Sequence, residues 1–164
     1  LSATPRLMYA LFVALEPELH RVRPDGHGFA FAEHLWHLAD LETEAFQVRL
    51  RRMLDEDAPF LADFDGAAAA RSRDYLALDP AEGLRRFTAA RARTLEAFSR
   101  LRGAEWGRLG EQQGAGTMSL AELPARMLAH DHDHLCQVRG LLSALRREAL
   151  TMLLGEVNPA EGCA

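Results

Sequence analysis

Six apolar residues between positions 31 and 53 recur at intervals close to three and four. They are Leu35, Leu38, Leu41, Ala45, Val48 and Leu50. An α-helix turns through about 100° per residue, so this spacing places them on one side of a helix. We therefore expect a long amphipathic helix here, in a fold that buries its apolar side against other helices.

Few residues of the chain favour β-strands. The 164 residues include five Val, six Thr and no Ile, whereas Ala, Leu, Arg and Glu dominate. These dominant residues are helix formers or are well tolerated in helices, so we expect an all-α fold. A chain of this length fits one domain, which we assign to residues 1–150, with residues 151–164 as a C-terminal tail.

Start and stop signals delimit four helices, at residues 4–15, 31–53, 79–101 and 119–150. Capping boxes in "DPAE" (79–82) and "SLAE" (119–122) mark the third and fourth starts. The long connection 57–78 predicts a crossover in a four-helix bundle. The glycine-rich stretch 103–118 lacks the spacing of a phosphate-binding loop, so we expect a flexible connector.

Charge and cysteine content limit the partners and the compartment. The formal net charge is -5, and all 19 basic residues are Arg, spread among acids. This pattern is typical of solvated helix faces and predicts no nucleic-acid partner, and no apolar run is long enough to predict a membrane span. With two cysteines, no CxxC spacing and no signal peptide, we expect a cytoplasmic protein in which Cys136 is a buried free thiol.

Three histidines stand at every second position in "HDHDHL", residues 130–135. On a helix His130 and His134 point within about 40° of each other, whereas His132 points to nearly the opposite side. Two histidines four residues apart on a helix can bind one metal ion. The same spacing also occurs in surface pairs and in hydrogen-bonded core histidines, and both alternatives stay open. We expect His132 to be exposed and not a ligand.

A metal site needs at least one further ligand, and "EHLWHLADLE" (33–42) offers two histidines. His37 lies nearer the line of Leu41 and Glu44, so it is the favoured third ligand, with His34 as the alternative. A ligating histidine usually donates its other ring N–H to a carboxylate or carbonyl. The candidate acids are Glu33, Asp40, Glu44, Asp131 and Asp133, of which we favour Asp40 and Glu44.

Four stretches make the chain resemble the DinB/YfiT-like superfamily of small helical bundles. They are "HLADLE" (37–42), "PFLADFDG" (59–66), "MSLAEL" (118–123) and "HDHDHLCQVRGLL" (130–142). The resemblance covers nearly the whole chain and implies a DinB-like four-helix bundle with a crossover between its second and third helices. It also implies a three-histidine metal site at His37, His130 and His134, for zinc, nickel or iron.

The resemblance implies an activity as well, with alternatives. Similar proteins are S-transferases and isomerases that use a low-molecular-weight thiol such as bacillithiol or mycothiol, so metal-dependent thiol transfer is the first expectation. A hydrolase in which the ion activates water and a non-catalytic, stress-linked metal-binding bundle are the alternatives, and a homodimer is compatible with each. We expect a small-molecule substrate, and Trp36, Phe46 and Trp106 could line its pocket, although such aromatic residues more often pack in a core.

Overall fold

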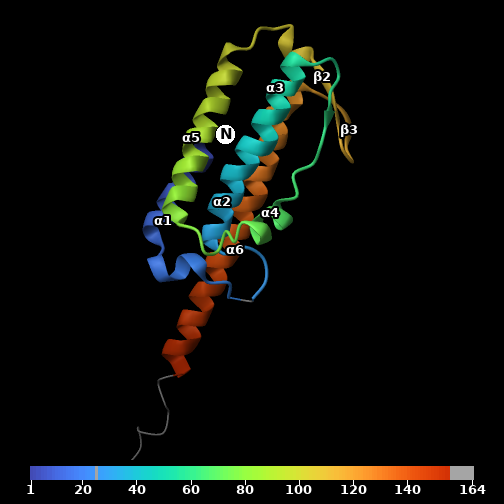
Figure 1. Ribbon diagram of the computed structural model, residues 1–164. Coiled ribbons are helices and arrows are strands. Elements are labelled where there is room, and N and C mark those ends of the chain that lie inside the picture. The colour runs from blue at the N-terminus through green and yellow to red at the C-terminus, as the bar shows by residue number, and fades with distance from the viewer. Residues whose placement is uncertain (25, 156–164) are drawn as a thin grey trace, which may run out of the picture.

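The computed structural model describes residues 1–24 and 26–155 (Figure 1). Four long helical rods form most of it: α1 (Ala3–Ala14), the continuous run of α2 (Phe31–Leu41), η2 (Glu42–Phe46) and α3 (Gln47–Asp55), then α5 (Pro80–Arg100) and α6 (Leu123–Gly155). The short helices are η1 (Pro17–Arg21), α4 (Gly66–Ser72), η3 (Glu105–Gly107) and η4 (Leu120–Glu122). The α2 helix packs against α5 and α6, and α1 packs against α5. A four-helix bundle is therefore confirmed as the main architecture.

The capping signals in the sequence mark real helix starts. Asp79 Oδ1 accepts a hydrogen bond from Ala81 N at 3.0 Å, and Pro80 occupies the first position of α5. At the start of η4, Ser119 N and Oγ both donate to Glu122 Oε2, at 2.6 and 2.9 Å. These bonds satisfy donors that a helix start leaves without partners.

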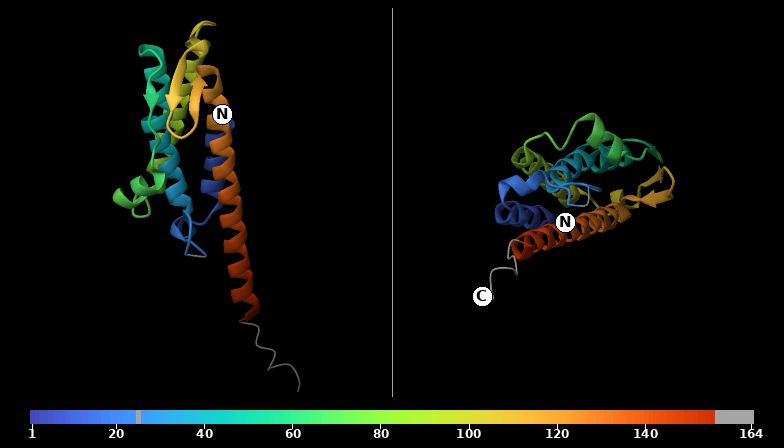
Figure 2. Two further views of the ribbon diagram at one scale, coloured as in Figure 1. Left: turned by 90° about the vertical axis from the view of Figure 1, so that its right-hand side faces the viewer. Right: turned by 90° about the horizontal axis from the view of Figure 1, so that it is seen from below.

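The last helix is longer than the sequence indicates. It passes Leu150 and continues to Gly155, and its C-terminal part projects beyond the other helices (Figures 1 and 2). Residues 156–164 of the expected tail lie outside the described residues, and the division of the chain at 150 stays a prediction. No helix within residues 1–24 and 26–155 combines the length and apolar character needed to cross a membrane.

The all-α prediction is wrong in one region, because the glycine-rich connector forms a hairpin. Strands β2 (Leu109–Gln112) and β3 (Gly116–Ser119) pair antiparallel, and β1 (Phe60–Leu61) from the crossover pairs parallel with β2. The hairpin lies at the end of the bundle where α3 ends and α6 begins (Figure 2). The predicted crossover between α3 and α5 is confirmed, and it contains β1 and α4.

Glycines allow this small sheet to form. Gly114 and Gly116 have φ angles of 72° and 77°, which side-chain-bearing residues rarely adopt. A Cβ on Gly110 would lie 2.7 Å from Leu61 Cδ1, so glycine lets β1 and β2 approach closely. The glycines that indicated a flexible connector instead make a tight turn and a close strand contact.

The prediction that Cys136 is buried is also wrong. Its side chain is exposed, and its Sγ lies 3.5 Å from His132 Nε2 on the outer face of α6. His134 and Val138 face the interior of the bundle, and residues two positions away point about 200° from them. The other cysteine, Cys163, lies outside the described residues.

A π-helical turn, η2, changes the register of the second rod. In a regular α-helix, His37 and Arg49 would lie twelve residues, and hence about 120°, apart around the axis. A π turn contains about one extra residue, which turns all later side chains back by about 100°. The turn therefore brings His37 and Arg49 to the same side of the rod, which a constant period of 3.6 residues does not predict.

The core of the described chain contains three apolar clusters, and a polar layer lies between the two largest of them. One contains Leu35, Phe87 and Val138, and the other contains Leu50 and Met127. Along α5 and α6 the buried charged residues and the histidines lie between the residues of these two clusters. The two apolar clusters therefore shield the polar layer from solvent along the length of the bundle.

Arg91 of α5 joins the rods within this layer and is only 1% exposed. It donates to Asp131 Oδ1 and Oδ2 of α6, at 2.8 and 2.6 Å, and to Glu42 Oε2 of η2 at 2.8 Å. Thr4 Oγ1 of α1 donates to the same Asp131 Oδ2 at 2.6 Å. One charged cluster thus contacts all four rods.

Replacing Arg91 tests this cluster. Arg91→Met should lower the free energy of unfolding by about 3–5 kcal/mol, because it leaves the carboxylates of Asp131 and Glu42 buried without their cation. Urea denaturation followed by circular dichroism measures the change. Arg93→Met, an exposed position on the same helix, is the control and should stay within about 0.5 kcal/mol of wild type. Equal stability of the two variants would contradict this account.

Candidate metal centre

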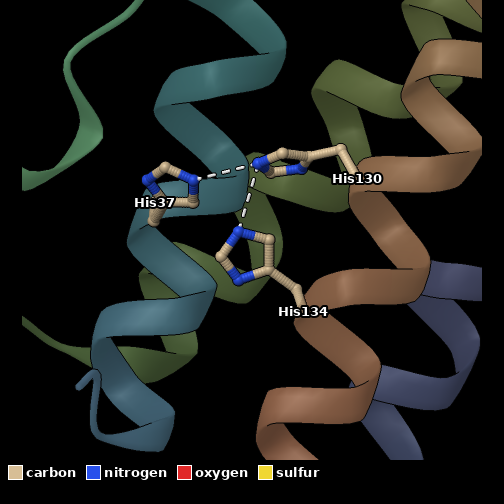
Figure 3. A group of neighbouring side chains, drawn as sticks. All are labelled: His37, His130 and His134. Atoms are coloured by element: carbon tan, nitrogen blue, oxygen red, sulfur yellow. Dashed lines mark hydrogen bonds between the residues drawn. The ribbon is translucent and has the colours of Figure 1, made fainter.

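The three predicted ligands lie together between α2 and α6 (Figure 3). His130 Nε2 lies 3.4 Å from His37 Nε2 and 3.2 Å from His134 Nε2. One ligand atom from each of the three lies within 4.8 Å of the other two. His37 and His134 are each 7% exposed, and His130 is half-buried. The structure therefore brings together the residues that the sequence singled out.

These distances fit a divalent ion. Imidazole nitrogens bind zinc at about 2.0–2.1 Å, so two nitrogens in a tetrahedral site lie about 3.3–3.4 Å apart. The observed separations of 3.2 and 3.4 Å match this value. Three imidazoles leave coordination positions open and suit several divalent metals, so the donor set does not select among zinc, nickel and iron.

Burial keeps the three rings neutral. Burial, and to a smaller extent the charge of a neighbouring histidine, lowers the pKa of His37, His130 and His134 to about 4 in each case. At neutral pH each ring therefore carries one N–H and one nitrogen lone pair, and the tautomers with the proton on Nδ1 direct three Nε2 lone pairs toward one another. Converging lone pairs repel one another, and a shared cation relieves that repulsion.

His34, the alternative ligand in the sequence analysis, lies behind His134. The Nδ1 atoms of the two rings are 2.8 Å apart, so one of them must carry the proton. When His134 directs the lone pair of Nε2 toward the cluster, its Nδ1 holds the proton and donates it to His34. Burial and the neighbouring histidines lower the pKa of His34 to about 3, so this ring stays neutral and its Nδ1 can accept the hydrogen bond. His34 thus fixes the orientation of the His134 ring.

The acids favoured for that orienting role have other partners. Asp40 accepts hydrogen bonds from Arg73 and Tyr75, and Glu44 accepts two from Arg73 at 2.5 and 2.8 Å. The prediction that Asp40 and Glu44 orient the ligands is therefore wrong. Helical spacing places an acid on a face, but it does not reveal an arginine that the crossover brings to that face.

Gly66 lets the crossover close over His37. A Cβ at this position would lie 2.2 Å from His37 Cε1 and 2.5 Å from its Nδ1, so a side chain would displace the ring. The Nδ1 atoms of His37 and His130 are buried and have no hydrogen-bond partner within the described part of the chain. On the Nδ1 side, packing rather than a hydrogen bond therefore holds these two rings, His37 against Gly66 and His130 against Phe46.

A cavity of about 410 Å³ opens beside the histidines, a size that fits a small molecule. Its lining residues are His37, Leu41, Phe46, Arg49, Asp63, Phe64, Gln112, Arg126, Ala129, His130 and Asp133. Of the three aromatic residues considered for a pocket, only Phe46 lines this one. Trp36 stacks on Tyr75 and Trp106 packs against Phe98. Arg49, Arg126 and Phe64 were not predicted at this site, because segments distant in sequence bring them to the cavity.

Comparisons with known proteins give a family and a fold. Residues 1–138 match the family described as the DinB superfamily. Among solved structures the chain is similar to YfiT from Bacillus subtilis, described as a probable metal-dependent hydrolase with an unusual four-helix bundle topology. The TM-score is 0.78 over 88% of this chain and 82% of that one, at 18% sequence identity, so this likeness shows the fold. No curated protein matches the sequence.

The metal-free protein should lose stability on acidification. The pKa of each buried histidine is lower in the folded chain, at about 3 for His34 and about 4 for the other three, than the value of 6.5 that we take for the unfolded chain. Above pH 6.5 both states are neutral and these groups add no pH dependence. Below it, only the unfolded state takes up their protons, so each histidine removes up to about 1.4 kcal/mol per pH unit.

Urea denaturation in EDTA at pH 7.5, 6 and 5 measures this loss. His34→Gln removes one of the four groups and should give a shallower slope than wild type. A free energy of unfolding that stays constant between pH 7.5 and 5 would contradict the expectation.

Proposed function

Because the chain belongs to the DinB superfamily, we propose that it is a metal-dependent enzyme in which His37, His130 and His134 bind one divalent ion. The observation that carries the proposal is the convergence of these three nitrogens beside a cavity of about 410 Å³. Zinc, nickel and iron are all candidates for the ion.

A bound divalent ion would supply Lewis acidity, which lowers the pKa of a water molecule or thiol. The residues of the chain supply the remaining functions. His34 holds the ring of His134, and Leu41, Phe46 and Phe64 give the cavity apolar walls that exclude water from part of it. Asp133 adds a carboxylate to the same wall as His130.

Hydrolysis is the reaction class that we favour. Asp133 is exposed, so its carboxylate can accept a proton from water as that water attacks a substrate. The likeness to YfiT, described as a probable metal-dependent hydrolase, supports the same class. Thiol transfer follows from the family resemblance alone and stays a prediction, as do a thiol partner, a homodimer and a cytoplasmic location.

The metal content of histidine variants tests the site. After purification without a histidine tag and dialysis against zinc, the wild type should hold about one ion per chain. His37→Ala, His130→Ala and His134→Ala should each lose it, because two imidazoles bind an ion far more weakly than three. Elemental mass spectrometry measures the content.

Two further variants sharpen this experiment. His132→Ala changes an exposed histidine on the same helix and should keep the wild-type metal content. His34→Leu should keep the site but weaken zinc binding about 10–100-fold in a chelator competition, because His134 loses its orienting partner. A wild-type content in His134→Ala would overturn the assignment of the ligands.

Turnover separates the two reaction classes. Asp133→Asn should lower kcat for hydrolysis of small esters about 100-fold or more, because the proton acceptor is lost, and should leave the zinc content unchanged. The assay uses zinc-loaded protein with and without a low-molecular-weight thiol. Asp57→Asn, an exposed acid that does not line the cavity, is the control. Turnover that requires the thiol, with the same kcat in Asp133→Asn as in wild type, would favour thiol transfer over hydrolysis.

A further inference from the structure

Two arginines line the same cavity as the histidines. Arg126 precedes His130 by four residues on α6, so the two side chains lie within about 40° of each other. Arg49 shares a side of the second rod with His37 because of the π turn in η2. The α6 helix runs antiparallel to the second rod, so both arginines lie on the hairpin side of the histidines (Figure 1).

Arg49 is buried but incompletely paired. Its Nη2 donates to Ala62 O and Asp63 Oδ1, each at 3.2 Å. Its Nε is buried and has no hydrogen-bond partner among the described residues. The Asp63 side chain is 60% exposed, so solvent screens much of its charge. A buried guanidinium with an unmet donor is costly unless an acceptor in the cavity completes its hydrogen bonds.

Arg126 brings a second positive charge to Arg49. Its Nη1 donates to the neutral Gln112 Oε1 at 3.1 Å. Its charge also acts on the carboxylate of Glu122, which is hydrogen-bonded to Ser119 rather than to Arg126. Burial lowers the pKa of Arg49, Asp63 opposes this effect, and the charge of Arg126 lowers the pKa further. Two cations that face one cavity repel each other, and an anion between them removes the repulsion.

Two acidic residues also line the cavity. Asp63 lies beside Arg49 and pairs with it at 3.2 Å, whereas Asp133 lies away from the two arginines. Asp133 follows Arg126 by seven residues, which is about 10 Å along α6. Leu41, Phe46 and Phe64 give the cavity its apolar wall. The hairpin side of the cavity therefore carries two guanidinium groups and one largely exposed carboxylate, that of Asp63, which leaves it net cationic. An apolar wall and a part with the histidines and Asp133 complete the cavity.

We propose that Arg49 and Arg126 form a subsite for an oxyanion group, a carboxylate or a phosphate, on a small substrate whose reactive bond lies beside His37 and His130. The inference deepens the proposed function, on which it rests, by naming the class of substrate. A guanidinium donates parallel hydrogen bonds to either kind of oxyanion. The apolar wall suits a substrate whose anionic group and reactive bond are joined by an apolar segment.

Titration of the full-length protein with inorganic phosphate and with acetate tests the subsite. The readout is the side-chain Nε–H signals of arginine in nitrogen–proton NMR spectra at pH 8 and constant ionic strength. At least one of the two anions should give a saturable shift, and the preferred anion tells phosphate from carboxylate. Metal-free and zinc-loaded protein are both measured, because an anion can also bind zinc directly.

Matched variants decide the outcome. Arg126→Gln and Arg49→Gln should weaken anion binding tenfold or more, whereas Arg51→Gln, an exposed arginine on the same helix as Arg49, should bind as wild type. If Arg49→Gln does not fold, Arg126→Gln alone carries the test. Wild-type binding by Arg126→Gln, or no saturable shift with either anion, would overturn the inference. The metal-free arm keeps this result separate from a failure of the three histidines to bind zinc.

Discussion

The buried ion pair between Arg91 and Asp131 sets the rotation of α6 about its axis. Asp131 directly follows His130, and adjacent side chains on a helix point about 100° apart. With Asp131 held toward α5 by two hydrogen bonds, His130 and His134 are directed toward α2. A buried ion pair contributes little net stability, because desolvation of both charges opposes their attraction. Its effect here is to define a single register in which the histidines meet.

The same charged cluster extends to the second rod. Glu42, the first residue of the π turn, accepts a hydrogen bond from Arg91, which fixes where the extra residue of the turn begins. The residues after it, Arg49 among them, therefore keep their direction toward the cavity. The α2 helix before the turn carries His37, and α6 carries His130 and His134. Because Arg91 of α5 is bonded to both rods, it aligns α2 with α6 around the cavity.

Local sequence signals predicted the parts of the fold that local forces determine. Helical periodicity and capping residues located the long helices, and the spacing of His130 and His134, with His37 one rod away, identified the side chains that meet. Contacts between distant segments were not predictable in this way. Three features depend on where another segment lies. They are the pairing of β1 with the hairpin, the hydrogen bond from Arg73 to Asp40, and the position of Arg49 after the π turn. A single sequence carries no signal at a fixed spacing for such contacts.

Anomalous X-ray diffraction at the zinc absorption edge, from crystals of the zinc-loaded protein, tests the central claim most directly. We expect one strong peak within about 2.0–2.1 Å of the Nε2 atoms of His37, His130 and His134. His34 should contact His134 rather than the metal. A principal peak at His132 and Cys136, or one that does not contact His37, would contradict the account.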